Sequence, residues 1–156
     1  MASVARRWQR ADWLAVLAVV LALMAAAPAI ATTIEPPPLS YTNLPFPVLN
    51  SPVAVGTPIV MLIARCADSR AEQPYIVSRE LVRVDDRLRI PLSPTRNMAR
   101  SGCEEYRAQT ATLPDDIDPG IYVYRGVASV QGWFRNYSVS WETEPFEIVA
   151  QQGEKP

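Results

Sequence analysis

The sequence predicts an all-β antiparallel sandwich that follows an apolar N-terminal helix and a proline-rich linker. After residue 52, short runs rich in β-branched and aromatic residues alternate with turn formers about every 8–12 residues, which is typical of a sandwich. No helical periodicity of sufficient length follows residue 31. Apolar residues make up 49% of the chain, so it can bury a core.

The N-terminal segment has the layout of an export signal. A basic start is followed by residues 13–31, which carry no charge and end in the small-residue site Ala29-Ile30-Ala31. One interpretation is a signal peptide over residues 1–31 that is cleaved after Ala31. The other is an uncleaved anchor that crosses the inner membrane through residues 13–31, with the N-terminus in the cytoplasm. Both interpretations place residues 32–156 outside the cytoplasm, in a periplasmic or similar compartment.

Residues 32–52 are predicted to form a proline-rich linker. Their prolines favour extended conformations and oppose helix, so a semi-rigid spacer is expected, with a ligand for an SH3-like or WW-like groove as the alternative. Leu44, Phe46, Val48 and Leu49 would allow the end of the linker to pack as a first edge strand. The domain is expected over 53–150, followed by a polar tail at 151–156.

Strand predictions follow the apolar runs and their alternation. A loop rich in arginine, serine and asparagine is expected at 93–102. The expected strands cover residues 59–66, 75–84, 87–92, 104–113, 121–130, 137–141 and 146–149.

The run Leu-Pro-Asp-Asp-Ile-Asp-Pro-Gly-Ile-Tyr-Val-Tyr-Arg-Gly at 113–126 resembles the tyrosine-corner region of immunoglobulin-like and fibronectin type III-like sandwiches. The resemblance implies that Tyr122 is the structural corner and that its hydroxyl bonds backbone in the preceding turn. Tyr124 stands where antibody-type domains carry a cysteine, so their inter-sheet disulfide is not expected. The resemblance concerns the fold and implies no particular activity.

Cys66 and Cys103 are the two cysteines of the chain, and in an exported protein they are expected to form one disulfide. In the sandwich topology implied by the resemblance, their strands are antiparallel neighbours. The bridge would then join two strands of one sheet. A reactive or metal-binding pair is the alternative.

Several chemistries are excluded or disfavoured by residue type. The chain has no histidine, so a Ser-His-Asp or Cys-His arrangement and a four-ligand Cys/His zinc site cannot form. Glu104 and Glu105 are consecutive strand residues that point to opposite faces. The acidic turn at 115–118 is expected to be solvated, with a calcium site as the alternative. We expect no enzyme, cofactor or metal; a carboxylate-dependent enzyme is the remaining catalytic alternative.

The candidate contact residues are exposed aromatics and arginines. Trp133 and Phe134 sit beside a glycine at an expected hairpin, where large apolar groups favour a contact surface or packing within the loop. Arg96 and Arg100 lie in the 93–102 loop and could meet an anionic partner, or belong to a mixed-charge surface. A net charge of −1 argues against nucleic acid. The predicted function is a non-catalytic binding or structural module with a protein or envelope partner; a phage-encoded envelope or lysis-accessory membrane protein is an alternative.

Overall fold

The computed structural model describes residues 2–150, with side chains described for 13–30 and 35–150. The chain divides into two units after Pro36. The first unit is the helix α1 (Ala2–Ile34). Its window Trp13–Ile30 has a mean hydropathy of 2.5 and is long and apolar enough to cross a membrane. The predicted apolar helix is therefore confirmed, while cleavage after Ala31 stays a prediction. The predicted polar tail at 151–156 lies outside the described residues.

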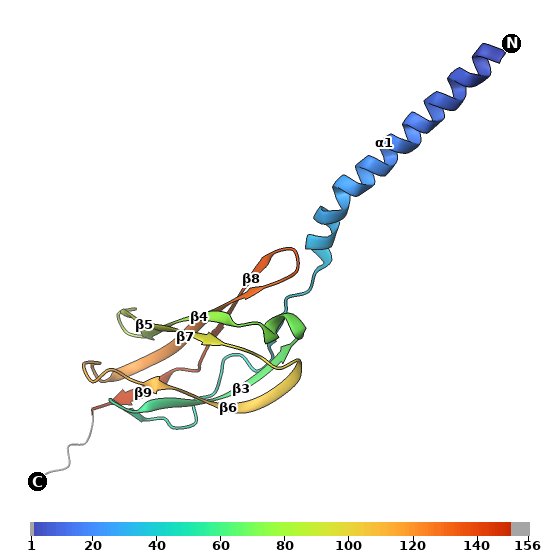
Figure 1. Ribbon diagram of the computed structural model, residues 1–156. Helices are drawn as coiled ribbons and strands as arrows, with labels where there is room; N and C mark the ends of the chain where they lie inside the picture. The colour runs from blue at the N-terminus through green and yellow to red at the C-terminus, as the bar shows by residue number, and fades with distance from the viewer. Residues whose placement is uncertain (1, 151–156) are drawn as a thin grey trace, which may run out of the picture. The chain divides into compact units, whose positions relative to one another are not determined.

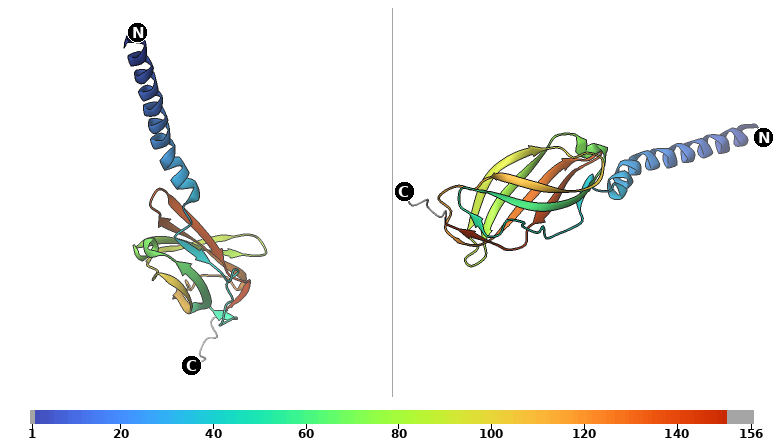
Figure 2. Two further views of the ribbon diagram at one scale, coloured as in Figure 1. Left: turned by 90° about the vertical axis from the view of Figure 1, so that its right-hand side faces the viewer. Right: turned by 90° about the horizontal axis from the view of Figure 1, so that it is seen from below.

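The second unit consists of two facing sheets (Figures 1 and 2). The smaller sheet has the order β1-β3-β6, with the bounds β1 (Leu39–Tyr41), β3 (Pro58–Ala67) and β6 (Gly102–Thr112). The larger sheet has the order β2-β9-β7-β4-β5, with β8 also paired to β7. Its bounds are β2 (Val53–Ala54), β4 (Tyr75–Arg83), β5 (Arg89–Asn97), β7 (Gly120–Gln131), β8 (Asn136–Glu142) and β9 (Phe146–Val149). The predicted two-layer β architecture is confirmed.

The core lies between the two sheets and follows the alternation of the strands. In β7 every second residue from Tyr122 to Val130 is buried, and the residues between them are at least partly exposed. This period of two places one face of the strand on the core. The largest fully buried side chains include Tyr122, Tyr124, Phe46, Leu39, Ile59 and Leu81. Each large apolar side chain buried in this way contributes about 1.5–3 kcal/mol.

The predicted boundary between linker and domain at residue 53 needs correction, because residues 37–52 belong to the second unit. Prolines lack an N–H and cannot complete a regular ladder with β3. Two asparagine side chains supply the missing bonds instead. The Asn43 side-chain oxygen accepts from the Ala64 N–H at 2.8 Å, and the Asn50 oxygen accepts from the Val60 N–H at 2.8 Å. The proline-rich segment therefore lines β3.

The same segment then passes from the smaller sheet to the larger one at Phe46. The Phe46 N–H donates to the Glu142 carbonyl at 2.8 Å, and the Glu144 N–H donates to the Phe46 carbonyl at 2.9 Å. Phe46 itself is fully buried. Phe46 forms a parallel bridge with Thr143, and beyond it β2 pairs with β9 in parallel, which departs from the predicted antiparallel pattern. Residues 37–54 thus close one side of the sandwich.

The predicted loop at 93–102 is also corrected, because β5 continues to Asn97 and pairs with β4. The register shifts between Val77 and Arg79, so β5 accommodates one extra residue next to Pro94. An edge strand tolerates Pro91 and Pro94 because the missing N–H groups need not face a neighbour. The connection after β3 contains a short 3₁₀ helix, η1 (Ser69–Glu72), in place of an irregular loop.

A disulfide and a tyrosine hydrogen bond hold parts of the sandwich together, and both were predicted from the sequence. Cys66 and Cys103 form a disulfide between directly opposed residues of β3 and β6, with a Cα–Cα distance of 4.0 Å. The prediction of a bridge within one sheet is confirmed. The Tyr122 hydroxyl donates to the Asp118 carbonyl at 2.8 Å, which ties the start of β7 to the preceding turn. This is the bond that the tyrosine-corner resemblance implied.

Candidate binding groove

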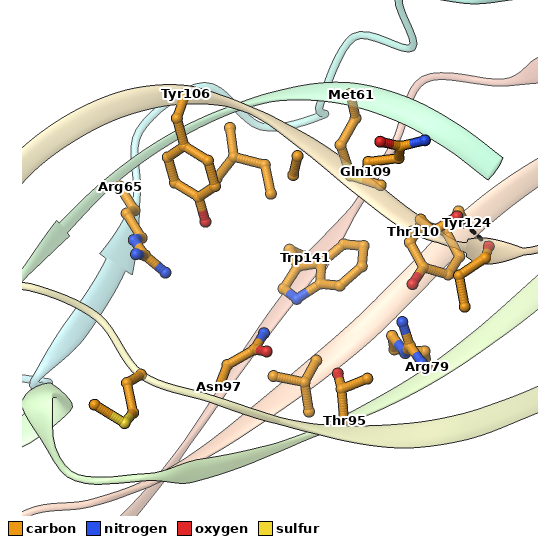
Figure 3. Close-up of a pocket in the computed structure, with 15 residues that line it drawn as sticks. Met61, Arg65, Arg79, Thr95, Asn97, Tyr106, Gln109, Thr110, Tyr124 and Trp141 are labelled. Carbon is orange, nitrogen blue, oxygen red and sulfur yellow. Dashed lines mark hydrogen bonds between the residues drawn. The ribbon is translucent and has the colours of Figure 1, made fainter.

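A groove of about 510 Å³ opens between the two sheets on the side of β5 and β6 (Figure 3). Within the described chain, β6 pairs with β3 alone and β5 pairs with β4 alone. Each sheet therefore ends at the groove without a covering strand. The labelled lining residues in Figure 3 are Met61, Arg65, Arg79, Thr95, Asn97, Tyr106, Gln109, Thr110, Tyr124 and Trp141.

Trp141 lies at the centre of the groove wall formed by the larger sheet. It stands directly opposite Gly126 in the β7–β8 ladder, and its indole occupies the space that a Cβ at Gly126 would need. Its ring centroid is 5.1 Å from that of Tyr124 and 5.6 Å from that of Phe46. The indole is therefore held by close packing. A glycine inside a strand often marks such a close approach, so Gly126 is a sequence signal for the position of this indole.

Arg65 occupies one end of the groove, and each of its three guanidinium nitrogens donates a hydrogen bond. It donates to the Glu104 carboxylate from Nε at 2.9 Å and from Nη2 at 2.5 Å. Its Nη1 donates to the Tyr75 hydroxyl at 3.2 Å, and its guanidinium lies 4.8 Å from the Tyr106 ring centroid. Burial raises the pKa of Tyr75 and Tyr106, and the Arg65 charge opposes this shift. This end of the groove is a closed polar network.

Arg79 lies at the other end and is only partly satisfied. In β4, Arg79 lies two residues from each of the buried residues Val77 and Leu81. Its side chain therefore points to the same, inner face of the strand. Its Nη2 donates to the Ser93 carbonyl at 2.6 Å, whereas its buried Nε has no hydrogen-bond partner. Burial raises the pKa of the adjacent Tyr124, against the opposing effect of the Arg79 charge.

No carboxylate lies within ion-pair distance of Arg79 among the residues that the structure describes. Polar side chains of Thr95 and Asn97 from β5 and of Gln109 from β6 stand along the rim (Figure 3). The groove thus combines an aromatic wall, amide and hydroxyl groups, and an arginine without a counter-charge. Arg79 was not among the site residues predicted from the sequence, although its place between Val77 and Leu81 in the alternation indicates that it points inward.

The predicted contact residues Trp133 and Phe134 lie in the turn between β7 and β8. They are 74% and 55% exposed, respectively. The guanidinium of Arg70 lies 4.8 Å from the Trp133 ring centroid, and Arg70 is itself buried and paired with Asp68. This cation–π contact orients the indole. A role in partner binding stays a prediction for both aromatic residues.

Arg96 and Arg100 do not share one loop as predicted. Arg96 belongs to β5, opposite Ile76 of β4, and Ile76 in turn is opposite Ser129 of β7. Arg100 lies in the connection that follows β5. Arg96 therefore shares an end of the larger sheet with the β7–β8 turn, two strands away from it. An anionic partner for these arginines stays a prediction.

Other arginines have carboxylate partners on the surface. Arg83 pairs with Asp86 at 2.5 Å and with Asp118 at 3.4 Å, and Arg125 pairs with Glu142 at 3.1 Å. These exposed pairs fit the mixed-charge interpretation of the arginine-rich region. Across the part of the chain that the structure describes, no group of three or more Cys, Asp or Glu side chains is placed to hold a metal ion.

Comparison with known proteins finds no matching family and no matching curated protein. Among solved structures, the chain is similar to a ceramidase complexed with C2, with 14% identity, a TM-score of 0.42, and coverage of 72% of this chain and 19% of that one. It is similar to the neutral ceramidase of Pseudomonas aeruginosa, with 16% identity and a TM-score of 0.40, over 65% of this chain and 19% of that one. An alkylpurine DNA glycosylase, AlkC, of Pseudomonas fluorescens, bound to DNA containing an abasic site analog, matches at 16% identity and a TM-score of 0.40, over 89% of this chain and 39% of that one. The chain thus spans less than half the length of each of these structures.

Proposed function

We propose that the second unit is an immunoglobulin-like binding module that works outside the cytoplasm and takes an anionic ligand into the groove. The strand order supports the fold assignment, because β1-β3-β6 corresponds to A-B-E and β7-β4-β5 to F-C-C′ of that fold. β8 and β9 follow one another along the other edge of β7 and together correspond to G. The Tyr122 bond to Asp118 supports it at the corner position. A strand in the D position next to β6 is not found in residues 37–150, and the groove opens there.

Two features support export. The α1 window Trp13–Ile30 is apolar enough to enter a membrane, either as a signal peptide or as an anchor. The Cys66–Cys103 disulfide fits an oxidising compartment, since cytosolic thiols are usually kept reduced. Under either reading of α1, the groove is presented to ligands of the cell envelope or its surroundings.

Arg79 is the observation that carries the choice of ligand. A buried N–H without a partner and a cation without a counter-charge both cost free energy in the unliganded protein. A ligand carboxylate would supply the counter-charge, because guanidinium and carboxylate form charge-assisted hydrogen bonds. Trp141 would contact the apolar part of the same ligand, and the Thr95 hydroxyl and the Asn97 amide would bond its polar groups. The module therefore binds an extended chain that bears a carboxylate.

The test is a titration of the full chain in detergent micelles, followed by the NMR signal of the Trp141 indole N–H. A six-residue polyglutamate peptide is compared with polyglutamine of the same length. We expect saturable shifts with polyglutamate alone. Arg79→Gln should weaken binding about tenfold or more, since one charge-assisted hydrogen-bond group is lost.

Arg87→Gln is the matched control, because Arg87 is an exposed arginine that does not line the groove. It should bind polyglutamate as the wild type does. Equal binding by the Arg79 and Arg87 variants would reject Arg79 as the anion site. Equal shifts with the two peptides would reject an anionic ligand.

A further inference from the structure

We propose that the free edge of β6 pairs with β6 of a second copy of this chain, antiparallel and around a two-fold axis at Tyr106. This inference goes beyond the proposed ligand groove and does not depend on it. The resulting assembly would have one continuous sheet in the order β1-β3-β6-β6-β3-β1. Three observations carry it: the direction of the β6 backbone groups, the chemistry of the two free edges, and the charge pattern of β6.

The register of β3 and β6 gives the direction of the backbone groups. The Ala64 carbonyl accepts a bond from segment 42–47 at 3.0 Å, and the Leu62 N–H donates to the same segment at 3.1 Å. Ala64 and Leu62 therefore direct their backbone groups away from β6. In an antiparallel ladder, opposed residues behave alike. Their partners Glu105 and Arg107 consequently direct their N–H and C=O groups away from β3, toward the free edge.

The two free edges beside the groove differ in chemistry. β5 contains Pro91 and Pro94, which remove donors and protect the strand from pairing with another chain. β6 contains no proline from Gly102 to Thr112. A long edge strand with intact donors and acceptors is a template for a further strand. The edge of β6 is therefore the one that can accept a partner along its length.

The charges on β6 select a second copy as that partner. Glu105 and Arg107 are both exposed on the outer face of β6. An antiparallel pairing centred on Tyr106 places Glu105 opposite Arg107 of the second copy and Arg107 opposite its Glu105. A register centred on Glu105 or on Arg107 would instead oppose like charges, which is unfavourable. In the described residues, neither side chain has an ion-pair partner within its own chain.

The proposed register also determines which side chains of the two copies contact each other on the inner face of β6. Glu105 and Arg107 would form the hydrogen-bonded pairs, so Tyr106 would meet Tyr106 of the second copy in a non-hydrogen-bonded pair, with Cα atoms about 4.5 Å apart. Tyr106 lines the groove in each chain. The β6 strand of the second copy would therefore border the groove and extend its wall.

The first experiment exchanges the charges in the full chain, kept in detergent micelles and followed by sedimentation equilibrium. The wild type should dimerise, and Glu105→Arg or Arg107→Glu alone should weaken dimerisation about tenfold or more, because each places like charges opposite one another. A mixture of the two single variants should form the mixed dimer, and the double variant E105R/R107E should recover the homodimer. Circular dichroism checks that the variants fold.

Several results would overturn the proposal. One is a wild type that stays monomeric over the accessible concentration range. Another is a dimer that all four proteins form equally, which would place its contacts away from β6. A monomer in which the polyglutamate peptide shifts the backbone N–H signals of Glu105 and Arg107 would assign the edge to a foreign peptide strand. These outcomes are independent of the Arg79 titration, so the two proposals can fail separately.

A cross-linking experiment tests the register directly. Tyr106→Cys places a thiol on the two-fold axis, and oxidation should link two copies while peptide mapping shows the Cys66–Cys103 bridge intact. Ala108→Cys is the matched control, since Ala108 would lie opposite Glu104 of the second copy and should not link to itself. Equal cross-linking by the two variants, or none by the Tyr106 variant, would reject the register.

Discussion

The two sides of the sandwich, where the edges of the sheets face one another, differ in whether a segment of the chain covers them. On one side, residues 37–54 run along β3, cross at Phe46 and end on β9, and they bury Leu39, Phe46 and Val53. On the other side, β5 and β6 end their sheets and contribute no buried residue. The first side is closed by apolar packing, and the second is left as a groove lined by polar and aromatic groups.

This difference separates the part of the sandwich that stabilises the fold from the part to which we assign the proposed binding. The closed side concentrates apolar burial, which stabilises the folded state, and it leaves few polar atoms free. The open side holds Arg79, whose Nε lacks a partner, at a cost to the unliganded protein. Such local costs are common at functional sites, where the best arrangement for a ligand is not the most stable one. Substitutions on the two sides should therefore differ in the sign of their effect.

The largest effect is expected at Phe46. Phe46→Ala removes a fully buried ring that packs on Trp141 and Tyr41, and it should lower the free energy of unfolding by about 3–5 kcal/mol. Leu49→Ala is the control in the same segment, because Leu49 is 46% exposed. Its cost should be below about 1 kcal/mol. Urea denaturation measures both, and equal losses would show that residues 37–54 do not close the core.

The second effect concerns the disulfide on the open side. Since β6 contributes no buried residue, its attachment depends on the ladder with β3 and on the Cys66–Cys103 bridge. Replacing the two cysteines by serine should lower the free energy of unfolding by about 2–4 kcal/mol. Hydrogen exchange should locate the loss, with β6 amides exchanging faster and β7 amides less affected. Uniform acceleration across both sheets would contradict a local role for the bridge.

A smaller effect of opposite sign is expected at Arg79. Arg79→Met keeps the length of the side chain but loses both the unpaired N–H and the Nη2 bond to the Ser93 carbonyl. An unsatisfied buried group costs about 1–3 kcal/mol and a made bond contributes about 0.5–1.5 kcal/mol, so the variant should raise the free energy of unfolding by about 0.5–2 kcal/mol. Arg65→Met is the matched comparison at the other end of the groove. It breaks the bonds to Glu104 and Tyr75 and should destabilise the protein. Destabilisation by both variants would mean that Arg79 supports the fold.

The features that the sequence predicted correctly are those set by local pattern. Alternation located the strands, and the resemblance around Tyr122 implied the bond from its hydroxyl to the preceding turn. Two cysteines in a chain expected to be exported indicated the disulfide. The closing role of residues 37–52 was predicted only in part, because proline content suggests a spacer. The Asn43 and Asn50 bonds that attach this segment to β3 depend on a partner strand that no local pattern reveals.

The groove was not predicted at all, for a physical reason. It exists because no strand covers β6 and β5, and a missing neighbour leaves no signature within a segment. The arginine, serine and asparagine content of residues 93–102 suggested a loop where β5 continues, so Thr95 and Asn97 were not among the candidate site residues. Trp133 and Phe134 were predicted to be exposed because they stand beside a glycine in an expected hairpin turn. The inward direction of Arg79 could be predicted only by knowing which face of β4 is buried.

The smallest expected effect is a difference between the two sides in how the free energy of unfolding depends on pH. Burial raises the pKa of Tyr41 on the closed side well above its usual value and raises that of Tyr106 on the open side less, with the Arg65 charge opposing both shifts. The unfolded chain therefore loses these phenol protons first, near pH 10, and stability falls as pH rises from there toward the folded pKa values. Tyr41→Phe should remove more of this alkaline loss than Tyr106→Phe, as measured by urea denaturation between pH 9 and pH 11. A larger change in the Tyr106 variant would mean that the β6 side is the more enclosed one, and would reverse the contrast between the two sides.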